Sequence, residues 1–288
     1  MNVHTLLDGL RFTEGPRWYD GALWFSDMHD HRVLRVTPDG AATTVAEVND
    51  DEPSGLGWLP DGRLLVVAME TQRLLRVDQD GSIATHADLS AAARGDLNDM
   101  IVAADGTAYV GDMGQRVQEG GARVPGQTFM VRPDGMWSVA ADDLSSPNGH
   151  VLSEDGRTLI VAESGGACLT AFDVAADGTL SGRRQFAALT TPVAGMPAVA
   201  DGICLDAEGA IWYADPLGGF VARVREGGEV TDRIPFDGVI PVACVLGGPE
   251  RRTLYMCVAA HWRRSELGDK RTARIDAVEV DIPGAGRP

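Results

Sequence analysis

Short apolar runs alternate with acidic or glycine-containing turns along the whole chain, and this pattern occurs six times. In each repeat a turn such as Asp-Gly precedes a short apolar run, which is followed by a second run and another turn. The first runs span residues 22–27, 63–68, 107–112, 157–162, 210–215 and 252–257. Such runs are too short for helices, and Gly after Asp suits a tight hairpin turn. The pattern therefore predicts short antiparallel strands.

The second runs lie at matching places in the repeat, and a further polar-apolar run follows most of them. They span residues 32–37, 73–78, 127–132, 169–174, 220–225 and 273–278. Each repeat then holds about four short strands, which is typical of a propeller blade. The sequence predicts an all-β, six-bladed β-propeller that occupies residues 1–288 as a single domain. Two separate sandwiches are the alternative, but the repeat crosses the middle of the chain without a linker.

The last repeat ends at the C-terminus with too few strands after it to complete a blade. Residues 3–7 form an extra run ahead of the first repeat. We expect this N-terminal strand to supply the outer strand of the last blade and close the ring.

Composition narrows the range of partners. The chain is 44% hydrophobic, which allows a sizeable core, and its net charge of −17 repels nucleic acid and anionic membranes. Residues 1–14 show no secretory signal, and no apolar run approaches the length of a membrane span. No cysteine lies in a C-x-x-C pair, which favours free buried thiols over a disulfide or thiolate site. We expect a cytoplasmic protein, monomeric or weakly dimeric, that binds a small molecule.

One position of the repeat carries polar residues where the surrounding strands are apolar. It begins the innermost strand of each blade, so its six side chains surround the central channel at one end. In chain order the position holds Glu14, Ser54, Asn98, Asn148, Asp201 and Val242. We refer to these six as the axial residues.

Four axial residues offer oxygen ligands of the kind that hard cations prefer: Glu14, Asn98, Asn148 and Asp201. Each one alone could be an ordinary turn residue, since Asn-Gly and Asp-Gly are good turn pairs. Four in the same register are harder to explain that way, because burying them without a cation costs free energy. The sequence predicts one divalent cation, with Ca²⁺ first and Mg²⁺, Mn²⁺ or Zn²⁺ as alternatives.

A second ring of side chains is expected at the same face, where the second strand of each blade ends. It comprises Asp27, Met69, Asp112, Glu163 and Asp215. Most of these acids are interpreted as caps that tie neighbouring strands together. For Asp112 with Met113, for Glu163 and for Asp215 we predict a place in the wall of a substrate pocket, because they stand beside ligand-bearing blades.

The motifs Glu14-Gly15-Pro16, Asn98-Asp99, Pro147-Asn148-Gly149 and Asp201-Gly202 resemble the landmarks of the gluconolactonase/regucalcin superfamily. The resemblance covers essentially the whole chain, in order and in register with the repeat. It implies a six-bladed propeller with one catalytic divalent metal that hydrolyses a lactone. It also implies that Glu14, Asn148 and Asp201 bind the metal directly and that Asn98 is a ligand or a neighbour on the substrate side. By the same resemblance Asp201 is the general base, and attack by its carboxylate is an open alternative.

The chain departs from the sugar-lactonase pattern two residues before the Asn-Asp pair. Relatives usually carry an Arg there that binds sugar hydroxyls, whereas this chain has Asp96. Arg116, further along the same blade, could take the place of that Arg. The expected substrate-binding set is Asp96, Asn98, Asp112, Met113, Arg116, Glu163 and Asp215. Residues 115–124 and 190–199 are insertions expected to set substrate choice. Two alternatives stay open, namely another ester or phosphotriester as substrate, and a non-enzymatic calcium-binding propeller. Proton transfer by His29, His31 or His150 is also possible, although a surface or core role suits each better.

Overall fold

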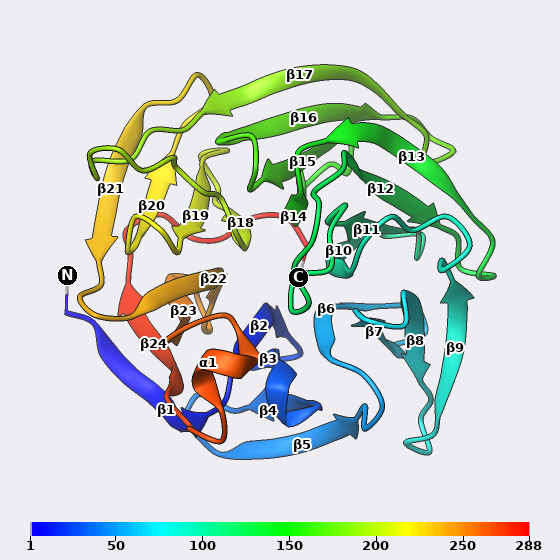
Figure 1. Ribbon diagram of the computed structural model, residues 1–288, viewed down its shortest axis with the longest axis horizontal. Coiled ribbons are helices and arrows are strands. Elements are labelled where there is room, and N and C mark those ends of the chain that lie inside the picture. Colours follow the sequence, from blue (N-terminus) through cyan, green and yellow to red (C-terminus); the bar gives the residue numbers. More distant parts are fainter. Residues whose placement is uncertain (1, 288) are drawn as a thin grey trace.

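Six four-stranded antiparallel sheets surround a central axis in the computed structural model, which describes residues 2–287 (Figure 1). The first blade comprises β2 (Thr13–Tyr19), β3 (Ala22–Asp27), β4 (Arg32–Val36) and β5 (Ala42–Glu47). The second comprises β6 (Pro53–Trp58), β7 (Leu64–Ala68), β8 (Arg73–Val77) and β9 (Ile83–Asp88). The third comprises β10 (Leu97–Val102), β11 (Ala108–Asp112), β12 (Gly126–Val131) and β13 (Trp137–Leu144).

The remaining three blades repeat the same order from the axis outwards. The fourth comprises β14 (Pro147–Leu152), β15 (Thr158–Glu163), β16 (Cys168–Val174) and β17 (Leu180–Ala188). The fifth comprises β18 (Ile203–Leu205), β19 (Ile211–Asp215), β20 (Phe220–Val224) and β21 (Val230–Pro235). The sixth comprises β22 (Ile240–Gly247), β23 (Thr253–Ala259), β24 (Ala273–Glu279) and β1 (His4–Leu10). The predicted six-bladed propeller is thereby confirmed.

The ring closes through the N-terminal strand, as the sequence predicts. β1 lies at the outer edge of the sixth blade and pairs antiparallel with β24, with His4 opposite Ala277 and Leu10 opposite Ala273. The strand is longer than the expected run of residues 3–7. The first and last parts of the chain therefore share one sheet.

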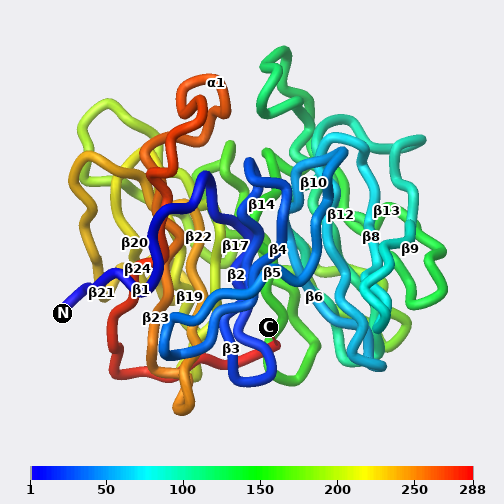
Figure 2. The backbone as a smooth tube through the Cα atoms, turned by 90° about the horizontal axis from the view of Figure 1, so that it is seen from below, coloured from blue at the N-terminus to red at the C-terminus, as the bar shows by residue number. Residues whose placement is uncertain are grey.

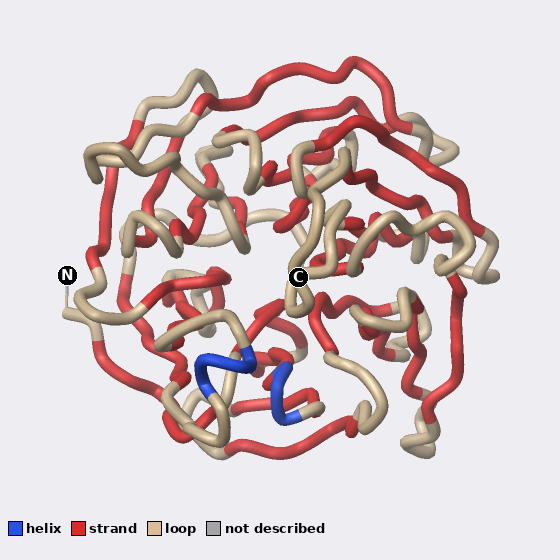
Figure 3. Tube along the Cα trace, in the orientation of Figure 1, coloured by secondary structure: helices blue, strands red, loops and turns tan. Residues whose placement is uncertain are grey.

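Burial explains why the strands near the axis are almost wholly apolar. Every residue of β6, β7, β10, β11 and β12 is buried, because both faces of a blade pack against neighbouring blades. The outer strands β5 and β9 expose half or more of their residues instead. In the described part of the chain, helix is confined to η1 (Met28–Asp30) and α1 (Arg264–Leu267), as Figure 3 shows. Within residues 2–287 no helix is long and apolar enough to cross a membrane.

The two ends of the central channel differ. In the side view of Figure 2, α1 and the green loop between β11 and β12 project from one face, and the C-terminal segment runs along the other. That segment is tied beneath the ring, where Gly284 N donates to Arg251 O at 2.7 Å and Ala285 N donates to Leu205 O at 2.9 Å. Access to the channel is therefore expected from the face that carries α1.

Candidate metal centre and active site

The axial residues occupy the start of the innermost strands, with Asp201 just ahead of β18. Five of these six strands pair irregularly with the second strand at this point, between Glu14 and Arg17, Pro53 and Leu56, Leu97 and Met100, Pro147 and His150, and Pro241 and Ala243. A β-bulge bends the strand and re-aims the side chain within it. The bulges thus free the axial side chains from the regular alternation of the sheet.

Glycines after the axial residues let neighbouring blades approach closely. A Cβ on Gly15 would lie 2.6 Å from the carbonyl oxygen of Ser54, and one on Gly149 would lie 2.7 Å from the nitrogen of Ile203. Neither position tolerates a larger residue without displacement of the adjacent backbone. The glycines of the Glu-Gly and Asn-Gly pairs therefore allow neighbouring innermost strands to lie close together at the axis.

Hydrogen bonds orient the amide ligands of the proposed set. Ser54 Oγ donates to Asn98 Oδ1 at 2.7 Å, and Asn98 Nδ2 points at Met113 Sδ at 3.6 Å. The Asn148 side chain forms a hydrogen bond with Asp201. Glu14, Ser54, Asn98 and Asn148 are all buried.

The two carboxylates are destabilised in their charged form. Burial raises the pKa of Asp201 to about 8, against the lowering effect of the Asn148 hydrogen bond and with a further increase from the charge of Asp99. Burial, followed by the charges of Asp201 and Asp99, holds the pKa of Glu14 well above its usual range. A cation between them would reverse these shifts, because it stabilises both charges.

The donor set fits a hard cation rather than a histidine or cysteine site. Within residues 2–287 no group of three or more His, Cys, Asp or Glu side chains is arranged to hold a metal. The axial set has only two such residues, and its other members, Asn98 and Asn148, contribute neutral amide oxygens. Two carboxylates with amide carbonyls match the oxygen ligands and the charge of Ca²⁺.

An ion pair lies next to the carboxylates in the channel. Arg17 Nη2 donates to Asp99 Oδ1 at 2.6 Å, and both side chains are almost fully buried. Asp99 also accepts from the nitrogen of Met100 at 2.8 Å. Arg17 neutralises one acid of the channel and leaves Glu14 and Asp201 as the pair without a basic hydrogen-bonding partner among the described residues.

A cavity of about 370 Å³ opens above the axial residues. Glu14, Asn98, Asn148 and Asp201 all line it, so the structure brings the four predicted ligands to one place. Met113 lines it as well. The loops singled out in the sequence contribute Gln115, Val117, Gln118, Arg123, Pro197 and Val199.

The acids of the predicted second ring do not line the cavity. Asp27 Oδ1 accepts from the backbone nitrogens of Arg11 and Phe12 at 2.9 and 3.1 Å, and Asp112 Oδ2 accepts from Arg94 N at 2.8 Å. Glu163 and Asp215 likewise accept from Ser145 N and Gly218 N, both at 2.7 Å. These acids tie loops together, as the capping interpretation expects, so the placement of Asp112, Glu163 and Asp215 in the pocket wall requires correction.

The residue one position further along faces the cavity instead, since successive side chains of a strand point to opposite sides. These residues are Met28, Met69, Met113, Ser164 and Pro216, each directly after the second strand of its blade. Met69 and Met113, which the sequence places in this wall, line the cavity as expected, whereas in the other blades the lining residue is one position beyond the expected acid.

Asp96 and Arg116 are also absent from the cavity wall. They bind each other, with Arg116 Nη1 2.8 Å from Asp96 Oδ1, while Val117 N donates to Asp96 Oδ2 at 2.7 Å. Arg116 Nη1 further donates to the carbonyl oxygen of Glu70 at 2.7 Å. The pair shapes the loop that follows β11, and neither side chain lines the cavity.

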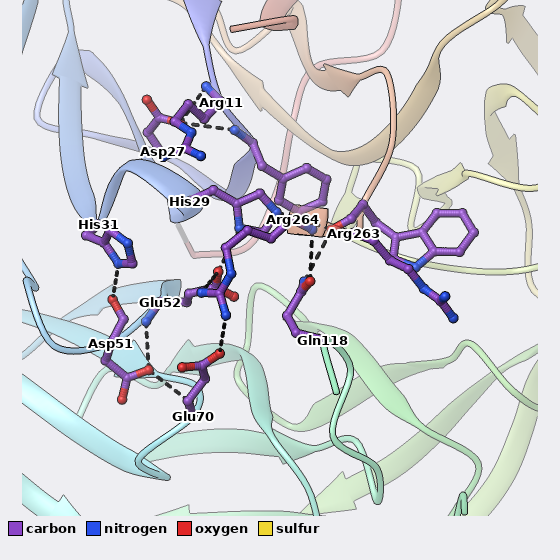
Figure 4. A network of polar contacts seen from close by, with 12 residues as sticks. Arg11, Asp27, His29, His31, Asp51, Glu52, Glu70, Gln118, Arg263 and Arg264 are labelled. Atoms are coloured by element: carbon purple, nitrogen blue, oxygen red, sulfur yellow. Dashed lines mark hydrogen bonds and ion pairs between the residues drawn. The ribbon is translucent and has the colours of Figure 1, made fainter. Parts of the chain in front are cut away.

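A loop of the sixth blade, residues 260–272 between β23 and β24, reaches over the mouth and was not anticipated from the sequence. Trp262 lines the cavity, and its carbonyl oxygen accepts from Gln118 Nε2 at 3.2 Å. Arg264 Nη1 lies 2.8 Å from Glu52 Oε1, as Figure 4 shows. The long polar stretch between the two runs of the sixth repeat was the available signal for this insertion.

None of the three candidate histidines lines the cavity. His29 Nδ1 is 2.8 Å from Glu52 Oε1, and His31 Nδ1 is 2.8 Å from the carbonyl oxygen of Asp51 (Figure 4). His150 is 2.5 Å from the carbonyl oxygen of Asn148 through Nδ1 and 3.1 Å from Thr128 Oγ1 through Nε2. Burial lowers the pKa of His150 to about 4, so its ring is neutral near pH 7. The three rings act as structural supports.

Fold and site together define a six-bladed propeller with an oxygen-donor set at the mouth of its central channel. The chain belongs to the SMP-30/Gluconolactonase/LRE-like family, whose model matches residues 12–260, and the resemblance inferred from the motifs is confirmed.

Named relatives in this family include sugar lactonases. The chain is 26% identical to a 6-deoxy-6-sulfogluconolactonase of Pseudomonas putida, over 96% of this chain and 93% of that protein. It is 26% identical to a pentonolactonase of Haloferax volcanii, over 100% and 97% of the two chains. A solved structure, described as the calcium-binding protein regucalcin of Agrobacterium tumefaciens, has a TM-score of 0.80 and 23% identity, over 99% of this chain and 95% of that one.

Proposed function

We propose that this protein hydrolyses a lactone with the help of one divalent cation bound by Glu14, Asn98, Asn148 and Asp201. The convergence of these four side chains at the floor of a 370 Å³ cavity carries the proposal. The lactonases among the relatives support the choice of bond.

A bound cation would polarise the ester carbonyl and stabilise the negative charge that develops on its oxygen. The chain's own residues supply the rest. Asp201, once deprotonated, accepts the proton of the attacking water and later returns it to the alkoxide that leaves when the ring opens. Burial raises the pKa of Asp201 to about 8 without a cation, and a bound cation would lower this pKa again, which keeps the carboxylate deprotonated, as a base requires.

The residues around Asp201 hold it in place for this role. The hydrogen bond from Asn148 fixes its carboxylate, and the hydrogen bond from Ser54 to Asn98 Oδ1 fixes the opposite side of the floor. The apolar wall above limits the water that reaches the carboxylate, which strengthens each electrostatic interaction in the cavity. Water attack therefore accounts for hydrolysis without a covalent enzyme intermediate.

We further propose Ca²⁺ as the cation. The set holds oxygen ligands only, and Ca²⁺ accepts amide and carboxylate oxygens in flexible geometry. Zinc sites in proteins usually contain His or Cys, which the axial set lacks. Calcium binding by the regucalcin relative, as its description states, agrees with this assignment.

The deciding experiment follows acid release from a panel of lactones with chelator-treated protein, with and without Ca²⁺, Mn²⁺, Mg²⁺ or Zn²⁺. We expect turnover that requires a cation and is lost by at least about 100-fold in Asp201→Asn. Asp143→Asn, a change of an exposed acid on β13, is the matched control and should leave the rate unchanged. Folded protein that binds the ion but opens no lactone would overturn the hydrolase proposal in favour of a calcium-binding propeller.

A further inference from the structure

We infer that the cavity selects lactones with an apolar substituent over polyhydroxylated lactones. The inference rests on the proposed hydrolase function and deepens it, since it names the substrate class. It is drawn from the walls of the cavity rather than from the metal site.

Apolar side chains surround the ligand floor on nearly every side. Three blades contribute methionines at equivalent positions, namely Met28, Met69 and Met113. Phe12, Leu217 and Trp262 complete the wall between them. Methionine is flexible and polarizable, so such a ring adapts to apolar groups of different shape.

The polar side chains that also line the cavity are largely engaged with the protein. Ser164 Oγ donates to the carbonyl oxygen of Ala200 at 2.6 Å. Gln118 uses both ends of its amide, accepting from Arg264 N at 3.0 Å and donating to Trp262 O at 3.2 Å.

The remaining polar pair, Gln115 and Arg123, is joined by a single hydrogen bond, and the exposed Arg123 is the one cationic side chain that lines the cavity among the described residues. Gln115 Oε1 accepts from Arg123 Nε at 3.2 Å. A sugar ring brings several hydroxyls, each of which loses hydrogen bonds to water when it is buried without a partner. The walls offer few replacements, whereas an alkyl or aryl substituent gains from burial against them.

Large hydrophobic side chains are exposed near lining residues in the loops of residues 115–124 and 190–199. Val124 follows Arg123 with 42% exposure, and Val193 and Met196 precede Pro197 with 38% and 41% exposure. These are among the few large hydrophobic side chains exposed in the described part of the chain. A substituent longer than the cavity would therefore still meet apolar surface at the rim.

Matched δ-lactones provide the first test, with the Ca²⁺-loaded protein as catalyst. We expect kcat/KM for a δ-lactone with a hexyl side chain to exceed that of the unsubstituted ring by about tenfold or more, because each buried methylene contributes to binding. Glucono-δ-lactone should fall below the unsubstituted ring. A preference for glucono-δ-lactone over the hexyl lactone would overturn the inference while leaving the hydrolase function intact.

A substitution in the cavity wall tests whether the wall causes the preference for an apolar substituent. Met69→Gln keeps the length of the side chain but adds a polar amide, and it should lower the ratio of hexyl to unsubstituted kcat/KM by about tenfold. Met136→Gln is the matched control, because Met136 is exposed between β12 and β13, away from the cavity. An unchanged ratio in Met69→Gln would contradict the assignment.

Binding of unreactive δ-lactams separates the two proposals. If calorimetry shows that the Ca²⁺-loaded protein binds a hexyl lactam at least about tenfold more tightly than a polyhydroxylated lactam, the selectivity stands even when no lactone is opened. In that case the proposed hydrolase function is refuted and the proposed selectivity is not. Equal binding, or tighter binding of the polyhydroxylated lactam, would refute the selectivity regardless of turnover.

Discussion

At the scale of single residues, the chemistry is concentrated in two acids that the fold holds in an unfavourable state. Glu14 and Asp201 lie 187 residues apart in the chain and are brought together by the fold. Burial raises the pKa of both carboxyls, and the charge of Asp201 raises the pKa of Glu14 further. Such perturbed carboxylates at the base of a cavity mark a functional site.

The free energy of unfolding of the metal-free protein should depend on pH because of Asp201. Its pKa is about 8 in the folded protein against an ordinary value of 3.8, so the folded state binds more protons between these values. The free energy of unfolding should therefore fall as pH rises from about 5 to about 8. Urea unfolding of chelator-treated protein measures this, and Asp201→Asn should flatten the slope. Ca²⁺ should remove the loss by stabilising the carboxylates, whereas stability that rises with pH would contradict the assignment.

The Arg17–Asp99 ion pair makes a second prediction at this scale. Arg17→Met leaves Asp99 buried without its partner and close to the other channel acids, which should lower the free energy of unfolding by about 3–5 kcal/mol. Arg17→Met combined with Asp99→Leu should recover most of the loss, because no unpaired charge is left. Urea unfolding of both variants tests the claim. A single variant within about 1 kcal/mol of the parent would show that the pair is dispensable.

At the scale of elements, closure of the ring depends on pairing between the two ends of the chain. β1 covers the edge of β24, buries Leu10 and forms a side-chain hydrogen bond from Thr5 to Asp276 at 2.8 Å. An uncovered β24 would present unpaired backbone groups to solvent.

Deleting residues 2–10 should therefore lower the free energy of unfolding by about 3 kcal/mol or more, through loss of leucine burial and strand pairing. Deleting only residues 2 and 3, which precede β1, should cost less than about 0.5 kcal/mol. Chemical denaturation compares the two. Equal stability of both deletions would mean that the sixth blade stands without its outer strand.

At the scale of the whole molecule, loops from different blades meet over the cavity. The loop of residues 260–272 comes from the sixth blade, and its Arg264 pairs with Glu52 of the second blade and contacts Gln118 of the third (Figure 4). Glu52 is fully buried and also holds His29 of the first blade. Contacts between residues of four blades therefore hold the loops at the opening of the cavity together.

Releasing this loop should weaken substrate binding as well as stability. Arg264→Met leaves the fully buried carboxylate of Glu52 with His29 as its remaining side-chain partner, so we expect the free energy of unfolding to fall by about 1–3 kcal/mol. KM for the best lactone should rise by about threefold to tenfold, because Trp262 is less firmly placed over the cavity. Arg263→Met is the control, since Arg263 is exposed and has no ion pair among the described residues. Identical KM values for both variants would rule out this role of Arg264.

Much of the fold and the floor of the site could be predicted from the sequence because both depend on the repeat. Alternation of apolar runs with Asp-Gly turns locates the strands, and one repeat position identifies Glu14, Asn98, Asn148 and Asp201. The walls are less predictable. A shift of one residue along a strand moves a side chain to the other face, which is why Glu163 and Asp215 were expected where Ser164 and Pro216 lie. Of the expected pair Asp112 and Met113, only Met113 lines the cavity.

The sequence by itself determined the number of blades and the closing strand, and it located four oxygen-bearing side chains at one repeat position, since these follow from local periodicity and its register. Only the tertiary structure decided that Arg116 is bound by Asp96, that Met28 joins Met69 and Met113 in the cavity wall, and that Trp262 lines the same cavity. The physical reason is that these features depend on contacts between segments far apart in the chain. Local propensity carries no information about such contacts until the blades are packed together.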